Sequence, residues 1–388
     1  MSVSNKRSNL ILSGGGVKGI AYIGALEEFE RRGWNFLNIA GVSAGSIVGT
    51  ILASGYSAHS LRGILNNFNF EKVKGSDIVR RIPMVSDYIH FFQDQRSLQE
   101  DMNPFLFMER LNKDYKHNLG EPNFFDMRSG IVKKIIKFCK QGYLFDGDYI
   151  EEWIYGILRK RGIRTFGDLR GGLSDRVNPN GYKMRMTAVD ATRGKIVVLP
   201  DDMEFYGINP DNLEVAKAVR MSTSVPFVFK PVHVKRIENN IQIDHNFVDG
   251  GVFDNFPFWL IDSKTRYVNR WGHPFNIPSI GMKLEGKKSF HGLNPFNILK
   301  NIISSIYDIG VPENVSFNEK NIIKINTSNI SFLDFDLSDD ELDYLMKYGY
   351  KSAKKFLGKD RIGGIDYWYL NSILILMLLF LKSFFNKI

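Results

Sequence analysis

Gly41-Val42-Ser43-Ala44-Gly45 is the stretch that decides the fold, because it separates an apolar run from a run of small residues. Residues 37–40 before it predict a short buried strand, and residues 44–53 after it predict a helix. A serine between two glycines at such a junction is typical of a nucleophile elbow, since the glycines leave room for a strained turn. The turn places the Ser43 hydroxyl at a helix N-terminus, where a developing negative charge is stabilised. The alternative is a turn of small residues in which Ser43 only caps the helix.

A second glycine-rich turn lies earlier in the chain. Residues 8–12 predict a strand, residues 20–32 predict a helix, and Gly14-Gly15-Gly16-Val17-Lys18-Gly19 lies between them. Two parallel strands joined by a helix predict a doubly wound, mostly parallel α/β sheet, whose turns open at the same edge. The backbone N–H groups of this turn can therefore face Ser43 and stabilise an oxyanion, since no Cβ atom blocks a close approach. The Lys18 ammonium either holds an anionic head group or is simply exposed to water.

The same turn also fits the G-x-G-x-x-G pattern of a dinucleotide site. That site needs a carboxylate about twenty residues later, at the end of the second strand, to bind the ribose. Here the second strand ends in Asn38-Ile39-Ala40-Gly41, which offers no carboxylate, and no Gly-Lys-Ser/Thr sequence of a nucleotide-phosphate loop follows the turn. The sequence therefore favours a serine nucleophile over a dinucleotide site, with a turn used only for its tight geometry as a further alternative.

A serine nucleophile needs a group that takes its proton. Asp249-Gly250-Gly251 combines a predicted strand end, an acid and a glycine turn, and an aspartate held against the hydroxyl in a dry site can accept that proton. An ordinary turn stabilised by the Asp249 side chain is the alternative. Of the 7 histidines, His273 and His291 are the two that follow Asp249, as a Ser-Asp-His order requires. Both lie in predicted polar loops, which favours the pair of Ser43 and Asp249 without a histidine.

These motifs together resemble the patatin-like phospholipase family. The resemblance covers about residues 10–284, with a weaker similarity to residue 357, and includes Ser222-Thr223-Ser224-Val225-Pro226 and Thr187-Ala188-Val189-Asp190. It implies a three-layer α/β/α fold and hydrolysis of lipid acyl esters by a Ser–Asp dyad, without a metal or an organic cofactor. By motif, it implies Ser43 as the nucleophile, Asp249 as the base, and an oxyanion loop of Gly14, Gly15, Gly16 and Lys18. Gly41 and Gly45 are then the elbow glycines, and Gly250 and Gly251 form the turn after the acid.

The substrate class stays open at this point. A phospholipid or lysophospholipid is the expected substrate, and a neutral lipid or a small ester acted on at the same site is the alternative. A membrane-binding protein with a vestigial site is a competitor from another class. Against it, both predicted catalytic residues and all the loop glycines are present.

The composition indicates a globular protein with an anionic partner. The 388 residues are 44% hydrophobic and 24% charged, and their formal net charge is +9. The basic residues are dispersed and no nucleic-acid motif is present, so we expect a membrane surface, and not nucleic acid, as the partner. The single cysteine predicts no internal disulfide, and we expect no signal peptide.

The rest of the chain alternates predicted strands and helices. Strands are predicted at residues 182–190, 195–199, 277–284 and 322–325, and two further apolar runs, residues 241–244 and 247–249, lead to Gly250-Gly251. Helices are predicted at residues 148–161, 215–222, 294–309 and from the capping box Ser338-Asp339-Asp340-Glu341 to about residue 357.

Residues 1–360 predict one hydrolase domain, with an aromatic-rich helical insertion at about residues 56–148 that forms either a satellite subdomain or a lid. Residues 365–388 form the most apolar stretch of the chain. As a helix, residues 368–385 are about 27 Å long, slightly less than the roughly 30 Å of a membrane hydrocarbon core. We expect this segment to anchor the protein to the cytoplasmic side of a membrane, and a helix packed on the core is the alternative.

Overall fold

The computed structural model describes residues 6–68, 142–143, 145–261, 267–268, 274–275, 277–286, 305, 319–327, 330–332, 337–358, 361–362 and 365–366. The chain divides into a larger unit of residues 1–70, 147–226 and 231–388, and a smaller unit of residues 71–146 and 227–230. In the smaller unit, the Phe145 amide donates to the Val228 carbonyl at 2.8 Å, and the Phe145 and Phe229 ring centroids lie 6.1 Å apart. The main sheet and the helices that cover it belong to the larger unit.

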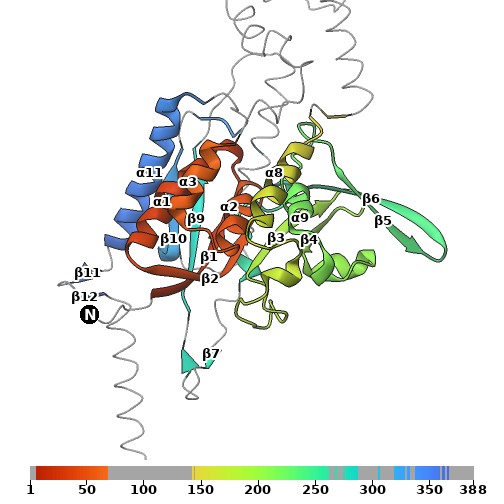
Figure 1. Ribbon diagram of the computed structural model, residues 1–388, viewed down its shortest axis with the longest axis horizontal. Helices are drawn as coiled ribbons and strands as arrows, with labels where there is room; N and C mark the ends of the chain where they lie inside the picture. The colour runs from red at the N-terminus through yellow and green to blue at the C-terminus, as the bar shows by residue number, and fades with distance from the viewer. Residues whose placement is uncertain are drawn as a thin grey trace, which may run out of the picture. The chain divides into compact units, whose positions relative to one another are not determined.

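An eight-stranded mixed sheet forms the centre of the larger unit (Figure 1). Its strand order is β10-β9-β1-β2-β3-β6-β5, and β4 also pairs with β3. Neighbours from β10 to β3 pair in parallel, whereas β4 and β6 are antiparallel to β3, and β5 is antiparallel to β6. The strands are β1 (Lys6–Leu12), β2 (Trp34–Gly41), β3 (Met184–Asp190), β4 (Lys195–Leu199), β5 (Val232–Glu238), β6 (Ile241–Asp249), β9 (Ser279–Glu285) and β10 (Ile322–Asn326). The prediction of an α/β fold with a mostly parallel sheet flanked by helices is confirmed.

Two short strand pairs lie apart from this sheet. In one, β7 (Tyr267–Val268) pairs with β8 (Pro274–Phe275), and in the other, β11 (Arg361–Ile362) pairs with β12 (Ile365–Asp366). Both pairs are antiparallel.

The two faces of the sheet are covered by different structures in the described part of the chain. Leu10 and Leu12 of β1 belong to a buried cluster to which every α-helix described here contributes side chains. Ile11, between them, belongs to a second cluster with Phe256 and Phe258. Because successive side chains of a strand point to opposite faces, the helices cover one face and residues 256–261 cover the other. The helices are α1 (Ala21–Arg31), α2 (Ala44–Ala53), α3 (Ala58–Asn66), α8 (Asp148–Arg159), α9 (Val215–Ser222) and α11 (Asp339–Gly358).

Helices α1 and α11 pack closely because each presents a glycine to the other's backbone. A Cβ on Gly24 would collide with the Met346 carbonyl, and a Cβ on Gly349 would collide with the Ala21 carbonyl. The start of α11 is the predicted capping box, since the Glu341 amide donates to Ser338 Oγ at 3.3 Å and the Ser338 amide donates to Glu341 Oε2 at 2.9 Å.

The C-terminal ends of β2 and β6 pair with the same edge of β3. Strand β4 pairs with β3 from Met186 to Asp190, so it occupies the other edge over that range. Gly41 of β2 lies opposite Met186, and Asp249 of β6 lies opposite Ala188. Because β2 runs parallel and β6 antiparallel to β3, their C-terminal ends approach each other from opposite directions. The two positions on β3 are two residues apart, which is about 7 Å along the strand.

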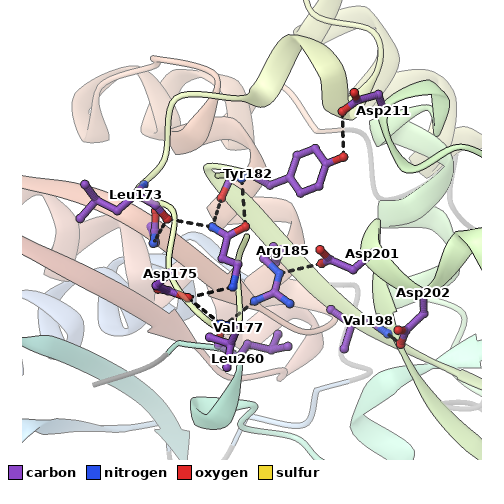
Figure 2. A network of polar contacts seen from close by, with 12 residues as sticks. Leu173, Asp175, Val177, Tyr182, Arg185, Val198, Asp201, Asp202, Asp211 and Leu260 are labelled. Carbon is purple, nitrogen blue, oxygen red and sulfur yellow. Dashed lines mark hydrogen bonds and ion pairs between the residues drawn. The ribbon is translucent and has the colours of Figure 1, made fainter. Parts of the chain in front are cut away.

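A network of polar contacts holds the beginning of β3 (Figure 2). The buried Arg185 side chain donates to Asp201 Oδ2 at 2.7 Å and to the Leu260 carbonyl at 2.8 Å. The Tyr182 hydroxyl donates to Asp211 Oδ1 at 2.7 Å. Burial and this hydrogen bond raise the pKa of the Tyr182 phenol above its ordinary value, so the phenol stays a donor. The strand against which β2 and β6 end is therefore fixed from both faces of the sheet.

The predicted elements match the described ones with small shifts at their ends. Helix α9 has the predicted bounds, α8 ends at Arg159, and the first helix begins with a 3₁₀ turn, η1 (Gly16–Ile20), ahead of α1. Helix α3 lies within the range predicted as an insertion and belongs to the larger unit, while most of that range lies outside the described residues. The helix predicted at residues 294–309, apart from residue 305, and the anchor predicted at residues 365–388, apart from residues 365–366, also lie outside them. No helix among the described residues combines the length and the apolar character needed to span a membrane.

Candidate active site

Ser43 lies at the junction of β2 and α2 with φ 52° and ψ −121°. A positive φ is uncommon for a residue with a side chain, and such a conformation costs about 1–3 kcal/mol. Ser43 is the N-cap residue of α2, but its side chain makes no capping hydrogen bond. The capping alternative therefore does not explain why a serine stands at this strained position.

The elbow glycines permit this turn because both face backbone atoms. A Cβ on Gly41 would lie 2.5 Å from the Gly45 carbonyl oxygen, and a Cβ on Gly45 would collide with the Leu12 carbonyl. A side chain at either position would push α2 away from the ends of β1 and β2. The two glycines thus hold the buried Ser43 against the edge of the sheet.

Asp249 ends β6 and is fully buried. Its Oδ1 accepts a hydrogen bond from the Gly251 amide at 2.8 Å, so the following glycine turn orients the carboxylate. A Cβ on Gly250 would lie 2.5 Å from the Thr187 carbonyl oxygen, which keeps the turn tight against β3. The predicted side-chain turn is therefore present. It is compatible with a catalytic role, because the sheet register brings Asp249 to the end of β2 that leads into Ser43.

The segment Ser222-Thr223-Ser224 connects the two predicted catalytic residues. The Ser43 amide donates to Ser222 Oγ at 3.1 Å. The Asp249 amide donates to the Ser224 carbonyl at 2.9 Å. The backbones of Ser43 and Asp249 are thus bound to positions two residues apart at the end of α9. This segment is part of the family resemblance in the sequence, but no local pattern indicates its role.

Arg220 holds this connecting segment from inside the protein. It is 2% exposed, and its Nη1 donates to Ser224 Oγ at 2.5 Å, while Ser224 Oγ donates to the Arg220 carbonyl at 2.6 Å. A Cβ on Gly147 would lie 2.6 Å from the Arg220 guanidinium carbon, so the start of α8 also packs on this side chain. The sequence patterns did not predict this role of Arg220, although it lies only two residues before Ser222.

The glycine loop supplies backbone donors next to Ser43. A Cβ on Gly14 would lie 3.2 Å from Ser43 Cβ, so the loop passes directly beside Ser43. The Gly14 amide itself donates to the Asn255 carbonyl at 3.1 Å. In the part of the chain that the structure describes, the amides of Gly15 and Gly16 donate to no acceptor. Ala44 begins α2, so its amide likewise has no acceptor within the helix.

Tyr22 fixes the base of the glycine loop. Its hydroxyl donates to the Ser13 carbonyl at 2.8 Å and lies 2.9 Å from Ser13 Oγ. Ser13 Oγ in turn accepts from the Leu284 amide on β9 at 3.1 Å. Burial raises the pKa of the Tyr22 phenol well above its ordinary value, so the phenol stays protonated and continues to donate. The loop conformation is therefore set by buried hydrogen bonds on both sides.

Lys18 is only 9% exposed, so simple exposure to water does not explain it. Its Nζ donates to the Gly286 carbonyl, at the end of β9, at 2.7 Å. This contact joins the glycine loop to the parallel half of the sheet. Lys18 therefore stabilises the position of the loop, and a contact with an anionic head group stays a prediction.

Three further observations concern an exposed apolar residue, possible metal ligands and the two histidines that follow Asp249. Phe253, four residues after Asp249 in the chain, is 50% exposed. Among the described residues, no group of three or more His, Cys, Asp and Glu side chains could hold a metal ion. His273 and His291 lie outside the described residues.

An open cavity of about 690 Å³ lies on α1, α3 and α11 and contains none of the predicted catalytic residues. Charged and tyrosine side chains dominate its lining, including the ion pair of Glu27 and Arg62 at 2.7 Å. Chemistry needs a nucleophile, a base and oxyanion donors at one place. Those groups gather at the end of β2, so we place the candidate active site there and not in this cavity.

Comparisons with known proteins show the family of the chain. The family profile described as Patatin-like phospholipase matches residues 10–262. The chain is 31% identical over 354 residues to "Uncharacterized protein YqhO" of Bacillus subtilis (strain 168), and the match covers 89% of this chain and 97% of that protein. It is 22% identical over 261 residues to "Probable lipid hydrolase 463L" of Invertebrate iridescent virus 6, covering 67% of this chain and 64% of that protein. Among solved structures, VipD from Legionella pneumophila matches with a TM-score of 0.45 and 18% identity, over 92% of this chain and 67% of that chain.

Proposed function

Because this chain belongs to the patatin-like phospholipase family, we propose that it hydrolyses acyl esters of phospholipids or lysophospholipids, with Ser43 as nucleophile and Asp249 as base. The observation that carries the proposal is the meeting of β2 and β6 on one edge of β3, which brings the serine elbow and the buried acid together. The shared attachment of both residues to Ser222-Thr223-Ser224 supports it.

In the first step, the Ser43 hydroxyl oxygen attacks the acyl carbonyl carbon while Asp249 takes the hydroxyl proton. The carbonyl oxygen becomes an oxyanion, which accepts hydrogen bonds from the amides of Gly15, Gly16 and Ala44. When the tetrahedral intermediate collapses, the bond to the glycerol oxygen breaks and Asp249 returns the proton to that leaving oxygen. The products of this step are an alcohol and an acyl ester of Ser43.

In the second step, a water molecule attacks the acyl-serine ester and Asp249 takes one of its protons. Collapse of the second intermediate releases the fatty acid and returns the proton to Ser43 Oγ. The side chains of Ser43 and Asp249 are 4% and 0% exposed, so few other water molecules compete with the hydrogen bonds of the reacting groups. The exposed ring of Phe253 offers an apolar surface for the acyl chain.

The substrate is tested by acyl-chain release. Full-length protein is incubated with phosphatidylcholine, lysophosphatidylcholine or triacylglycerol, each labelled in the acyl chain, and free fatty acid is measured. We expect release from a phospholipid or lysophospholipid that Ser43→Ala abolishes and Ser54→Ala leaves intact. Release from triacylglycerol alone would assign a neutral-lipid hydrolase, and no release by the folded protein would contradict the proposed function.

The base is tested by histidine replacement. His273→Ala and His291→Ala are each expected to change hydrolysis less than about tenfold, because a general base contributes roughly 10²–10⁴. A loss in either variant equal to that of Ser43→Ala would replace the dyad by a triad.

The membrane association of the chain is also a proposal. The formal net charge of +9 supports contact with a membrane surface. The apolar residues 365–388 support the proposed anchoring to the cytoplasmic side of the membrane. Truncation after Ile365 is expected to move the protein to the soluble fraction and to preserve hydrolysis of a water-soluble ester. A truncated protein that melts well below the full-length protein would instead place this segment in the core.

A further inference from the structure

The hairpin of β5 and β6 projects away from the helices around it (Figure 1). Its strands pair from Val232 opposite Phe247 to Glu238 opposite Ile241, and Asn239 and Asn240 form the two-residue turn. Both turn residues have positive φ, 50° and 62°, which is the geometry of a tight turn that matches the twist of the strands. The tip of the hairpin is therefore a well-defined structure.

Two isoleucines flank this turn and are the most exposed large apolar side chains in the described part of the chain. Ile237 is 77% exposed and Ile241 is 65% exposed. Ile237 lies opposite Gln242, and Ile241 lies opposite Glu238. Because paired residues share a face and successive residues alternate, the two isoleucines point to opposite faces of the hairpin. Apolar surface is therefore presented on both sides of the tip.

The stem behind the tip is rigidly held. The Arg236 and Arg193 guanidinium groups lie 4.0 Å and 3.8 Å from the Phe205 ring centroid. Buried His245 on β6 contacts Asp190 of β3 through Nδ1 at 2.8 Å, and the Tyr206 hydroxyl donates to the same carboxylate at 2.8 Å. The tip thus carries two exposed isoleucines beside the polar residues Glu238, Asn239 and Asn240. The part of the stem next to it carries cations, of which Arg236 pairs with Glu238, and it is clamped to the body.

We propose that the tip of this hairpin, Ile237 to Ile241, docks the protein to a lipid surface by inserting both isoleucines among the lipids. A folded protein partner covers one face of a hairpin, whereas a fluid lipid phase surrounds both faces, and each face of this tip carries an exposed isoleucine. Lys235 and Arg236 then lie at the level of the phosphate groups, where cations are favoured. The proposal rests on the proposed function, since the lipid phase is the source of the substrate.

Docking at this tip also orients the site. Ile241 and Asp249 are the two ends of β6, so eight residues, or about 27 Å, of continuous strand separate the tip from the predicted base. The clamped stem makes that distance fixed. A protein held at the tip therefore keeps its site within about 27 Å of the point of docking.

The test uses the single cysteine of the chain. In full-length protein with Cys139→Ser, the variants Ile237→Cys, Ile241→Cys and the control Lys160→Cys each receive an environment-sensitive fluorophore. The vesicles contain diether phosphatidylcholine, with or without diether phosphatidylglycerol, so that no acyl ester can be hydrolysed. We expect a blue shift and quenching by brominated lipid at positions 237 and 241, and neither at position 160. Binding with both tip probes still in water would overturn the proposal, and shielding of one probe alone would assign a protein-type contact instead.

A second measurement separates docking from catalysis. The double variant Ile237→Ser/Ile241→Ser is expected to lower hydrolysis of vesicle phospholipid at least about tenfold, since two apolar side chains no longer enter the lipid. Hydrolysis of a water-soluble short-chain ester stays unchanged, and the control Gln242→Ser retains both activities. Unchanged vesicle hydrolysis in the double variant would overturn docking and leave the proposed function intact. Lipid-shielded probes in a protein that hydrolyses no ester would support docking and contradict the proposed function.

Discussion

The parallel and antiparallel halves of the sheet contribute different parts of the candidate site. The parallel half, β10, β9, β1 and β2, carries the glycine loop and Ser43 within residues 14–45. The antiparallel half, with β4, β5 and β6 arranged on β3, brings Asp249 from about two hundred residues later. If β6 ran parallel to β3 on this edge, its C-terminal end would lie farther along β3 and would point away from the end of β2. The reversal of β6 is what brings Asp249 to the predicted nucleophile.

The largest expected effect comes from the acid in the antiparallel half. Asp249→Asn should lower turnover on the order of 10⁴-fold, because the amide cannot take the serine proton and the members of a catalytic unit act together. The matched control is Asp244→Asn, which makes the same chemical change at an exposed position of the same strand. Fatty-acid release by the two purified variants is compared, with circular dichroism as the check on folding. Equal activity in both variants would remove Asp249 from the mechanism.

The next effect comes from the glycine loop in the parallel half. Gly16 has φ +55°, and a Cβ there would collide with the Phe332 carbonyl, so Gly16→Ala must displace the loop. Loss of one oxyanion donor costs about 2.7–4 kcal/mol, which is a reduction of roughly 10²–10³ in turnover, and Gly16→Val should be at least as harmful. Gly33→Ala is the control, because its φ of +76° imposes the same strain with no atom within 4 Å of the added Cβ.

The measurement for this pair is turnover per folded molecule, with stability determined separately by urea unfolding. The loop explanation fails if Gly33→Ala loses as much turnover as Gly16→Ala. NADH binding by the native protein that Gly16→Val abolishes would restore the dinucleotide interpretation.

The segment that connects the two halves should give a smaller effect. Ser222→Ala removes the side-chain acceptor of the Ser43 amide, a single neutral hydrogen bond worth about 1 kcal/mol, so turnover should fall by roughly fivefold. Ser54→Ala is the control, since it removes another buried serine hydroxyl, bonded to the Thr50 carbonyl on α2. The ratio of turnover in the two variants, at equal folded fraction, is the readout. A ratio near one would mean that the elbow keeps its geometry without this contact.

The smallest effect on activity is expected at Glu28, which lies on α1 far in sequence from the acid. Burial raises the pKa of the Glu28 carboxyl, but the hydrogen bonds from Arg31 and Arg32 outweigh it, and the net pKa lies below the ordinary value. A depressed pKa contributes stability above the unfolded-state pKa of about 4.3, and this contribution is lost as pH falls through the folded-state pKa. Urea unfolding should therefore lose more stability between about pH 7 and about pH 3 in the native protein than in Glu28→Gln.

Turnover at neutral pH should be unchanged in Glu28→Gln, apart from its lower stability. The control is Glu152→Gln at an exposed position of α8. If the free energy of unfolding falls by the same amount between these pH values in the native protein and in Glu28→Gln, the Glu28 carboxyl is not the source of the acid sensitivity.

Much of the parallel half was predictable because its signals are local. The glycines that flank Ser43 and the run from Gly14 to Gly19 lie within one strand–helix–strand unit, whose handedness and direction follow general rules. The same holds for α9 and for the capping box of α11, whose determinants lie within a few residues of each other. The roles of Ser43 and Asp249 stay predictions, but the turn geometry that those roles require is present.

The sequence by itself determined the family, the parallel strand–turn–helix unit, the strained serine and the glycine turn that follows Asp249, because each depends on residues adjacent in the chain. Only the tertiary structure decided that β6 runs antiparallel and ends opposite Ala188, that Ser222 and Ser224 bind the two predicted catalytic backbones, and that Arg220 lies beneath them. It also decided that Lys18 is buried against Gly286 instead of facing water, and that Ile237 and Ile241 are exposed on opposite faces. Strand direction and register depend on pairing between distant segments. A sequence pattern reports which face of a strand is apolar, but not which neighbour the strand will have.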